Sequence, residues 1–314
     1  MSPNKKLGQH WLRDSVSLKS IADCAELSPD DVVLEIGPGL GTLTEVLLQQ
    51  AGQVVAVEID EELAESLRGM AGGHPGLDPG SRKKLNEKSS SVLEIINTDF
   101  LEFDLSQLPV GYKVVGNIPY YITSKIVRKL LTAENKPSLI VLLVQKEVAE
   151  RLAAEPGEMS VLSVAAQFYA DVSLGPIIKA EKFDPPPKVD SQVVIFRPYS
   201  SLRGGTTKQS RLENHESRIT TYDVRKKHKS GLPRSLRSLA MTPEEEKYFF
   251  RIVKAGFSQR RKKLRTSLAG GLNISKAEAE ELLQKANIDP NLRAQDLSLS
   301  DWAQLAKSYQ VRPK

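Results

Sequence analysis

Five consecutive residues, Asn117-Ile118-Pro119-Tyr120-Tyr121, join an amide, a rigid proline and two aromatic rings directly after an apolar segment that is expected to be a strand. The Asn117 side-chain carbonyl can accept one N–H of an exocyclic amine on a flat base, and a backbone carbonyl at Ile118 or Pro119 can accept the other. Pro119 has no competing N–H and holds the turn rigid. The Tyr120 ring can stack on the base. The motif predicts an amine pocket; the alternative is a structural turn followed by two core tyrosines.

Gly37 and Gly39 lie in a turn that follows a second apolar strand, expected over residues 32–36, and an amphipathic helix comes next. Because glycine has no Cβ, the backbone can approach a ligand closely at this edge of a parallel sheet. A dinucleotide-binding turn would carry another glycine three residues after Gly39, where this chain has Thr42. The turn therefore predicts a cofactor site and argues against the generic rival, a nicotinamide-dependent dehydrogenase.

Two acidic residues follow the next two expected strands. Glu58 ends an apolar strand over residues 53–58, and Asp99 is the acid at the end of a third strand, in the segment 95–100. A carboxylate in the place of Glu58 can accept both hydroxyls of a ribose, and Asp99 suits an adenine amino group. An acid on the ribose does not by itself distinguish cofactors. The order of glycine turn, acid, acid and Asn-Pro-Tyr predicts an S-adenosylmethionine (SAM) site beside an amine pocket.

These motifs resemble those of the rRNA adenine dimethyltransferase family, specifically its bacterial small-subunit branch. The resemblance covers nearly the whole chain and is carried by Lys6–Leu12, the glycine turn, Glu58, Asp99, Asn117–Tyr121, Gln145–Val148, Phe183–Ser191 and Phe257–Lys262. It implies transfer of methyl groups from SAM to N6 of two adjacent adenosines near the 3′ end of small-subunit (16S) rRNA. It also implies an immature small ribosomal subunit as the partner and a role in subunit biogenesis.

The resemblance implies a set of cofactor contacts: His10, Leu12, Gly37, Gly39, Glu58, Asp99 and Asn117. Two positions depart from the family pattern, which often has Asn in place of His10 and Phe in place of Trp11. Both replacements keep a polar residue followed by an aromatic one. The role of the His10 side chain is left open by the sequence.

The expected reaction is a direct in-line methyl transfer from a sulfonium to the adenine N6, which requires neither a metal nor a covalent protein intermediate. Hydrogen bonds from both amine protons to Asn117 and a neighbouring carbonyl favour the pyramidal, nucleophilic amine, so catalysis rests on positioning and electrostatics. Phe183 is a candidate for a second stacking ring opposite Tyr120. The alternative for Phe183 is a core aromatic at the base of a loop.

The chain of 314 residues has a formal net charge of +5, which suits a polyanionic partner without proving one. Cys24 is the only cysteine, so an intramolecular disulfide is excluded and a reducing, cytoplasmic location is expected. The polar N-terminus does not resemble a signal peptide. The longest apolar run, residues 139–144, is too short to span a membrane. The protein is expected to be a monomer.

Alternating strands and helices up to about Phe196 predict a doubly wound, Rossmann-like α/β methyltransferase domain over residues 1–199. Strands at 172–178 and 192–196 are expected to form an antiparallel edge hairpin, and residues 1–14 an arm over the cofactor. Residues 69–91 and 200–240 lack apolar periodicity and are expected to be disordered insertions. For 201–237 the alternative is a basic RNA-binding tail. Residues 241–314 are expected to form a small α-helical RNA-binding domain.

Five cations near the start of that helical domain are candidates for neutralising RNA phosphates: Arg260, Arg261, Lys262, Lys263 and Arg265. The alternative is a solvated charged face. Two other functions stay open beside small-subunit rRNA methylation. One is methylation of another adenine substrate, large-subunit rRNA or DNA. The other is a mainly non-enzymatic role as an RNA-binding assembly factor.

Overall fold

The computed structural model describes residues 9–70, 83–86, 89–199 and 242–310. The chain divides into two compact units, Met1–Pro198 and Tyr199–Lys314, and each is described by itself. None of the helices within the described residues has the length and apolar character that crossing a membrane requires.

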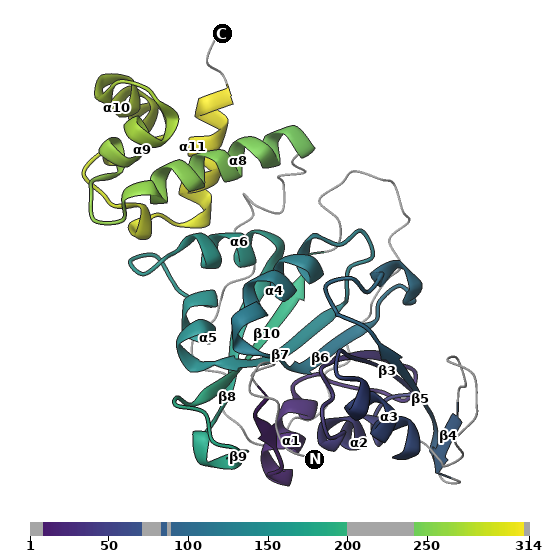
Figure 1. Cartoon of the computed structure of the whole chain (residues 1–314). Coiled ribbons are helices and arrows are strands. Elements are labelled where there is room, and N and C mark those ends of the chain that lie inside the picture. The colour runs from purple at the N-terminus through teal and green to yellow at the C-terminus, as the bar shows by residue number, and fades with distance from the viewer. Residues whose placement is uncertain (1–8, 71–82, 87–88, 200–241, 311–314) are drawn as a thin grey trace, which may run out of the picture. The chain divides into compact units, whose positions relative to one another are not determined.

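The N-terminal unit is built on a twisted sheet whose described strands run in the order β4-β5-β3-β2-β6-β7-β10-β8 (Figure 1). Its five central strands are parallel: β5 (Ser89–Asn97), β3 (Gln53–Glu58), β2 (Val32–Ile36), β6 (Lys113–Asn117) and β7 (Leu139–Gln145). The strand β10 (Ser191–Pro198) pairs antiparallel with β7 and with the edge strand β8 (Ala170–Ile178). The predicted doubly wound sheet with its antiparallel edge hairpin is confirmed.

Helices cover both faces of this sheet (Figure 1), which explains why its central strands are rich in apolar residues. On one face, α1 (Ser15–Asp23) and α2 (Thr42–Leu48) pack with alternate residues of the central strands, and α3 (Glu61–Met70) lies against β3 and β5. On the other face, α4 (Thr123–Thr132), α5 (Lys146–Leu152) and α6 (Val161–Tyr169) bury the intervening strand residues. The carboxyl ends of the parallel strands therefore lie together at one end of the sheet, which is here called the open edge.

The segment 69–91 is more ordered than expected. Helix α3 continues to Met70, and β4 (Lys83–Asn86) pairs antiparallel with β5, which already begins at Ser89. The prediction of a loop is therefore wrong at residues 69–70, 83–86 and 89–91, because the chain adds an edge strand to β5. Residues 71–82 and 87–88 lie outside the described residues, as does the expected insertion 200–240.

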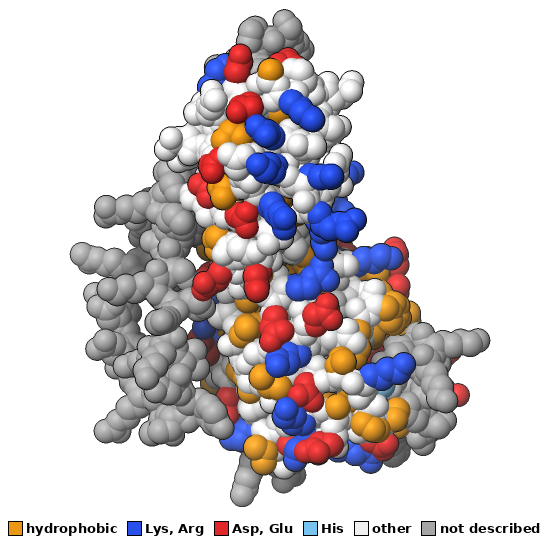
Figure 2. Space-filling view, turned by 90° about the vertical axis from the view of Figure 1, so that its left-hand side faces the viewer, with side chains coloured by type: hydrophobic (Ala, Val, Ile, Leu, Met, Phe, Trp, Pro, Cys, Tyr) orange, Lys and Arg blue, Asp and Glu red, His pale blue; other side chains and the backbone are white. Residues whose placement is uncertain are grey.

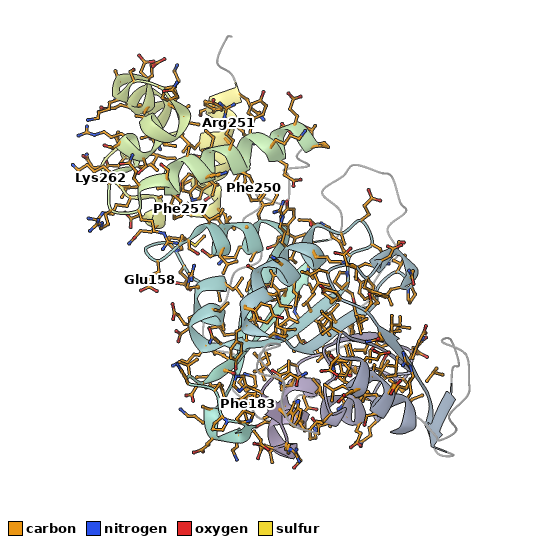
Figure 3. The ribbon with its side chains drawn as sticks, in the orientation of Figure 1. Glu158, Phe183, Phe250, Arg251, Phe257 and Lys262 are labelled. Atoms are coloured by element: carbon orange, nitrogen blue, oxygen red, sulfur yellow. The ribbon has the colours of Figure 1, made fainter. Side chains whose placement is uncertain are left out.

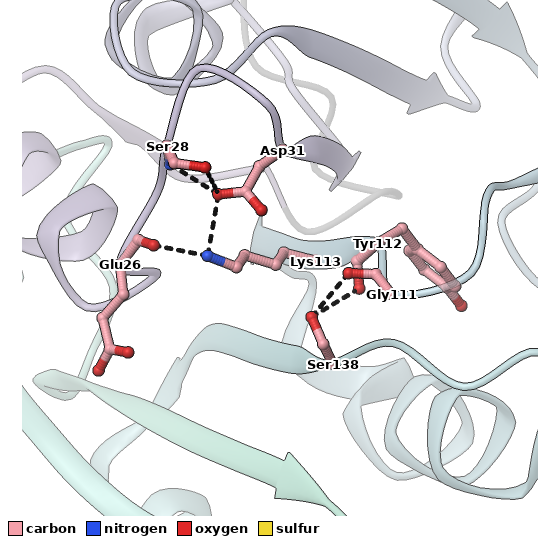
Figure 4. Close-up of polar contacts among 7 residues, drawn as sticks. All are labelled: Glu26, Ser28, Asp31, Gly111, Tyr112, Lys113 and Ser138. Atoms are coloured by element: carbon pink, nitrogen blue, oxygen red, sulfur yellow. Dashed lines mark hydrogen bonds and ion pairs between the residues drawn. The ribbon is translucent and has the colours of Figure 1, made fainter. Parts of the chain in front are cut away.

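A polar network fixes the amino ends of β2 and β6, at the edge opposite the open one (Figure 4). The Lys113 ammonium donates to the Glu26 carbonyl and to the Asp31 carboxylate, at 3.0 Å from Oδ2. Ser28 donates its N–H and its hydroxyl to the same Oδ2, at 2.6 and 2.9 Å. Partial burial raises the pKa of Asp31, but the hydrogen bonds from Lys113 and Ser28 outweigh it and lower the pKa below 3.8.

The C-terminal unit is a small bundle of helices α8 (Pro243–Gly256), α9 (Leu264–Leu272), α10 (Lys276–Lys285) and α11 (Leu299–Gln310). Capping boxes start two of them, from Thr242 with Glu245 and from Ser275 with Glu278. The core centres on Trp302, which is fully buried and stacks on Phe257 with ring centroids 5.5 Å apart.

Candidate active site at the open sheet edge

A cavity of about 340 Å³ lies at the carboxyl ends of β2, β3, β5 and β6, closed on one side by residues 9–12. Ten of the residues singled out from the sequence line it: His10, Leu12, Gly37, Gly39, Glu58, Asp99, Asn117, Ile118, Pro119 and Tyr120. They come from five separate segments of the chain. The structure therefore brings the predicted cofactor residues and the predicted amine pocket to one place.

The glycine turn leads from β2 into α2 through left-handed backbone at each of its glycines. The φ angles of Gly37, Gly39 and Gly41 are 66°, 57° and 80°, a region that residues with a Cβ rarely adopt. A Cβ on Gly39 would lie 3.6 Å from Cδ1 of the Trp11 ring, so that ring packs directly over the turn. The turn is thus held open toward the cavity by backbone conformation and covered by Trp11.

Glu58 is buried at the end of β3, with both carboxylate oxygens bonded to backbone N–H groups. Oε2 accepts from Gly39 and Oε1 from Asp60, each at 3.0 Å. Burial raises the pKa of Glu58, and these hydrogen bonds oppose the rise. Asp99 accepts the Leu101 N–H at 2.8 Å through Oδ1. Because each carboxylate oxygen has two lone pairs, both side chains keep acceptor capacity for a ligand.

Residues 9–14, here called the arm, are tied to neighbouring segments by strand pairing, hydrogen bonds and ring stacking. The short strand β1 (Trp11–Leu12) pairs antiparallel with β9 (Phe183–Asp184). Thr42 donates its hydroxyl to the Leu12 carbonyl at 2.9 Å. The His10 Nδ1–H donates to the Pro185 carbonyl at 2.8 Å, and the His10 ring stacks on Tyr120 with centroids 6.0 Å apart. His10 therefore belongs to the wall of the cavity, next to the Tyr120 ring.

The Asn117 amide is oriented by the arm. Its Nδ2 donates to the His10 carbonyl at 3.3 Å, which leaves Oδ1 as the acceptor of the amide group. The Pro119 carbonyl accepts the Ile122 N–H at 3.3 Å, whereas no hydrogen bond to the Ile118 carbonyl occurs within the described residues. Of the two backbone acceptors that the sequence left open, Ile118 is thus the one whose carbonyl accepts no other hydrogen bond within the described residues.

Tyr120 is half-buried, and its position is fixed from two sides. Its hydroxyl shares a hydrogen bond of 2.9 Å with the Ser191 hydroxyl at the start of β10, and its ring faces His10. Burial raises the pKa of the Tyr120 phenol, so the ring stays neutral at physiological pH. The neighbouring Tyr121 is 63% exposed and lies at the cavity rim. The alternative of two core tyrosines is therefore wrong for Tyr121.

Phe183 does not line the cavity. It is 4% exposed and packs with Leu12, Leu18 and Ile178 in the core on the arm side of the sheet (Figure 3). Pairing of β9 with β1 places it directly opposite Leu12 and so inside that core. The prediction of a second stacking ring is corrected: the structure assigns Phe183 to the apolar core that supports the arm.

Glu35 was given no role from the sequence, yet it lines the cavity. Its carboxyl is 1% exposed, and neither its Oε2 nor the buried Thr44 hydroxyl has a hydrogen-bond partner of ordinary geometry within the described residues. Burial raises the pKa of Glu35 to about 8; the nearby Thr44 hydroxyl lowers it and the Glu58 carboxylate raises it further. An acidic residue inside an apolar strand, two positions before the glycine turn, is the signal that could have found it.

Lys129 on α4 holds the loop that follows Asp99. Its ammonium donates to three carbonyls, those of Phe100, Leu101 and Phe103, at 2.9, 2.7 and 2.6 Å. It also lies 5.2 Å from the centroid of the Phe100 ring, which lines the cavity. Burial lowers the pKa of Lys129, and nearby carboxylates oppose this shift. The Lys129 side chain therefore joins α4, the helix that follows the amine pocket, to the loop that follows Asp99.

The five cations predicted to bind RNA lie in the C-terminal unit and fall into two groups. Arg260, Arg261 and Lys262 are exposed. Lys263 donates to Asn291 Oδ1 at 2.8 Å, and Arg265 pairs with the Glu280 carboxylate at 3.5 Å. Lys and Arg side chains gather on the face of this unit that Figure 2 presents. The first group is therefore free of the local contacts that engage the second.

Comparison with known proteins identifies the family from the sequence, and solved structures share the architecture. The profile of the family described as ribosomal RNA adenine dimethylase matches residues 1–203. Proteins named ribosomal RNA small subunit methyltransferase A are similar along the full length. The one from Dehalococcoides mccartyi (strain CBDB1) is 35% identical over 100% of this chain and 90% of its own. The one from Nostoc sp. (strain PCC 7120) is 35% identical over 97% of each.

Two solved structures share the architecture. The 23S rRNA methyltransferase ErmE superposes with a TM-score of 0.64 at 26% identity, covering 96% of this chain and 99% of that one. A dimethyladenosine transferase from Plasmodium falciparum gives a TM-score of 0.66 at 22% identity, covering 94% and 96%. The latter similarity supports the fold alone.

Proposed function

The chain belongs to the ribosomal RNA adenine dimethylase family, and from that premise we propose how the residues around its cavity perform the family's reaction. The protein is a SAM-dependent methyltransferase that dimethylates adenosine in small-subunit rRNA. Full-length similarity to small-subunit enzymes favours this substrate over large-subunit rRNA and over a purely non-enzymatic role. We further propose that the substrate is a pair of adjacent adenosines near the 3′ end, presented by an immature small ribosomal subunit.

The convergence of the glycine turn, Glu58, Asp99 and Asn117 on one cavity is the observation that carries the proposed cofactor site. Glu58 accepts the ribose hydroxyls, Asp99 accepts an adenine amino hydrogen, and the glycine turn allows close approach of the methionine part. The residues fit this ligand because Glu58 and Asp99 line the cavity with acceptor capacity to spare, and because Glu35, whose Oε2 has no hydrogen-bond partner within the described residues, lies beside the turn. When bound, SAM supplies a methyl group already activated on a sulfonium.

Asn117 and Ile118 hold the reacting amine. Asn117 Oδ1 accepts one N6 hydrogen and the Ile118 carbonyl the other, while the Tyr120 ring stacks on the base. With both hydrogens directed to acceptors, the nitrogen lone pair is drawn out of the base π system and becomes nucleophilic. The bound cofactor would supply the methyl group, and Asn117 and Ile118 would hold the amine while it is transferred. These residues act by positioning and by stabilising the positive charge that develops on nitrogen.

The site must also accept the monomethylated amine. That amine has one hydrogen left, so only one of the two acceptor hydrogen bonds can persist in the second transfer. The His10 ring and the Tyr120 hydroxyl, held by Pro185 and Ser191 respectively, keep the walls of the pocket in place between the two steps. We propose that the second transfer relies more on the stacked Tyr120 ring than the first.

The experiment that tests the proposed function is mass spectrometry of small-subunit rRNA from cells that lack this gene and from cells that regain it. Dimethyladenosine is expected to return with the wild-type chain and not with Asn117→Ala. Calorimetry with SAM separates the two parts of the site, because Glu58→Ala and Asp99→Ala are each expected to weaken SAM binding by about 1.5–3 kcal/mol. Unchanged affinity in both variants would show that the cofactor assignment is wrong.

A further inference from the structure

Helix α8 of the C-terminal unit carries Lys247, Arg251 and Lys254, all exposed, along one side. Their spacings of four and three residues place them on a single face of a helix with 3.6 residues per turn, spanning roughly 10 Å of its axis. The opposite side is buried in the bundle through Phe249, Ile252, Val253 and Gly256. The three cations are here called the α8 basic face.

The charge of this face is not neutralised locally. Arg265 pairs with Glu280 in the same unit, but none of the three α8 cations forms an ion pair with a carboxylate in the part of the chain that the structure describes. The acidic residues of α8 are confined to its first turn, where Glu245 closes the capping box with Thr242. Carboxylates at that end stabilise the helix dipole and leave the rest of the face positive.

Arg251 is also held in place. Its guanidinium carbon lies 5.6 Å from the centroid of the Tyr309 ring, which α11 supplies, and Tyr248 meets the same ring edge-on at 6.2 Å. A cation–π contact of this kind restricts the side chain while leaving its N–H groups available to a ligand. Ordering before binding reduces the entropy lost when a partner is bound.

The basic run already described follows the α8 basic face along the chain. After α8 the chain makes a single turn, η5 (Phe257–Gln259), and then exposes Arg260, Arg261 and Lys262. Among the described residues of this unit, Leu292 is the single large apolar side chain that is exposed. The surface therefore offers a ligand cations rather than aromatic rings. Such a surface suits the phosphate backbone of RNA and not base edges.

We infer that the α8 basic face binds the phosphate backbone of the rRNA and extends the phosphate-binding surface beyond residues 260–265; this inference rests on the proposed function. Backbone contacts fix position without reading sequence. The α8 basic face would therefore set how tightly the substrate is held and would leave the chemistry at the amine pocket unchanged.

The test compares two matched pairs of substitutions in the full chain. One is Lys247→Gln with Lys254→Gln on the basic face; the control is Lys276→Gln with Lys285→Gln on α10, also exposed and also ending in the last turn of its helix. Arg251 is kept because it packs on Tyr309. Binding to small subunits that lack the methylation is measured at several salt concentrations. The basic-face pair is expected to weaken binding roughly 10-fold at low salt and to lower the slope of log K against log salt by about 1.5.

The control pair is expected to bind as the wild type does, and single-turnover methylation at saturating subunits is expected to be unchanged in both pairs. An unchanged slope in the basic-face pair, or equal losses in the two pairs, overturns the inference. A loss that appears with subunits but not with protein-free small-subunit rRNA also overturns it, because the occupant is then an acidic protein. A wild-type chain that fails to methylate is a different result, which refutes the proposed function itself.

Discussion

Glu35 is a carboxyl group placed in the apolar interior of β2, where it faces the cavity without a hydrogen-bond partner for Oε2 within the described residues. Such a group is uncharged at neutral pH because its pKa is raised to about 8. SAM is a cation at its sulfonium and at its α-amino group. A nearby positive charge favours the ionised carboxylate, so binding is coupled to release of the Glu35 proton.

We expect SAM affinity to rise as the pH increases toward about 8 and then to level off. The sign follows because the free protein holds the proton below that pH and must release it to bind. Glu35→Gln should flatten this dependence. Calorimetry in two buffers of different ionisation enthalpy measures the released proton directly. Glu58 is the comparison, because its pKa is raised too: a slope that survives in Glu35→Gln and vanishes in Glu58→Gln contradicts the assignment to Glu35.

At the scale of secondary-structure elements, two half-buried lysines each join separate parts of the N-terminal unit. Lys113 begins β6 and joins it to Asp31 before β2, whereas Lys129 near the end of α4 joins that helix to the loop after Asp99. The first network lies away from the cavity and the second forms part of its wall. Substituting the two lysines should therefore affect different properties of the protein.

Removing Lys129 should act on the cofactor. Lys129→Met releases three loop carbonyls, so the Asp99 loop is no longer held, and we expect SAM affinity to fall about 10-fold with turnover at saturating SAM little changed. Lys129→Arg keeps the charge and N–H donors and should restore part of the affinity. Arg128→Met, an exposed cation on the same helix, is the control. If Lys129→Met lowers turnover and leaves SAM affinity intact, the loop is positioned by something else.

Removing Lys113 should act on stability. Lys113→Met leaves the Asp31 carboxylate partly buried without its cation, and we expect a loss of roughly 2–3 kcal/mol in the free energy of unfolding. SAM affinity should stay at the wild-type value, because the network lies at the amino end of β6 and Asn117 at its carboxyl end. Denaturant unfolding and calorimetry on the same sample check both statements. A Lys113→Met protein of normal stability would show that the ion pair contributes little.

Much of this architecture could be predicted because each element has a local cause. The buried strands are runs rich in apolar residues, Thr242 and Ser275 cap their helices, and the glycines of the turn need left-handed backbone. What could not be predicted depends on contacts distant in sequence. Pairing of Leu12 with Phe183 decides that Phe183 is core, and the three carbonyls that fix Lys129 are contributed by another loop.

At the scale of the whole molecule, the proposed functions are divided between the two units. The N-terminal unit contains the cavity and the amine pocket, and the C-terminal unit carries the cations assigned to rRNA phosphates. A division of this kind predicts that the transfer step and substrate affinity respond to different substitutions. Variants in the amine pocket should lose the transfer step while still binding subunits, and variants of the basic surfaces should lose affinity and salt dependence.

The most direct test of the central claim is single-turnover methyl transfer by Asn117→Ala, with SAM and unmethylated small subunits both saturating. We expect the rate to fall by about 10²-fold or more, because an acceptor that holds the amine in the transition state is lost. SAM affinity should be reduced only modestly and subunit binding should be unchanged. An Asn117→Ala protein that transfers the methyl group at the wild-type rate would contradict the amine-pocket mechanism.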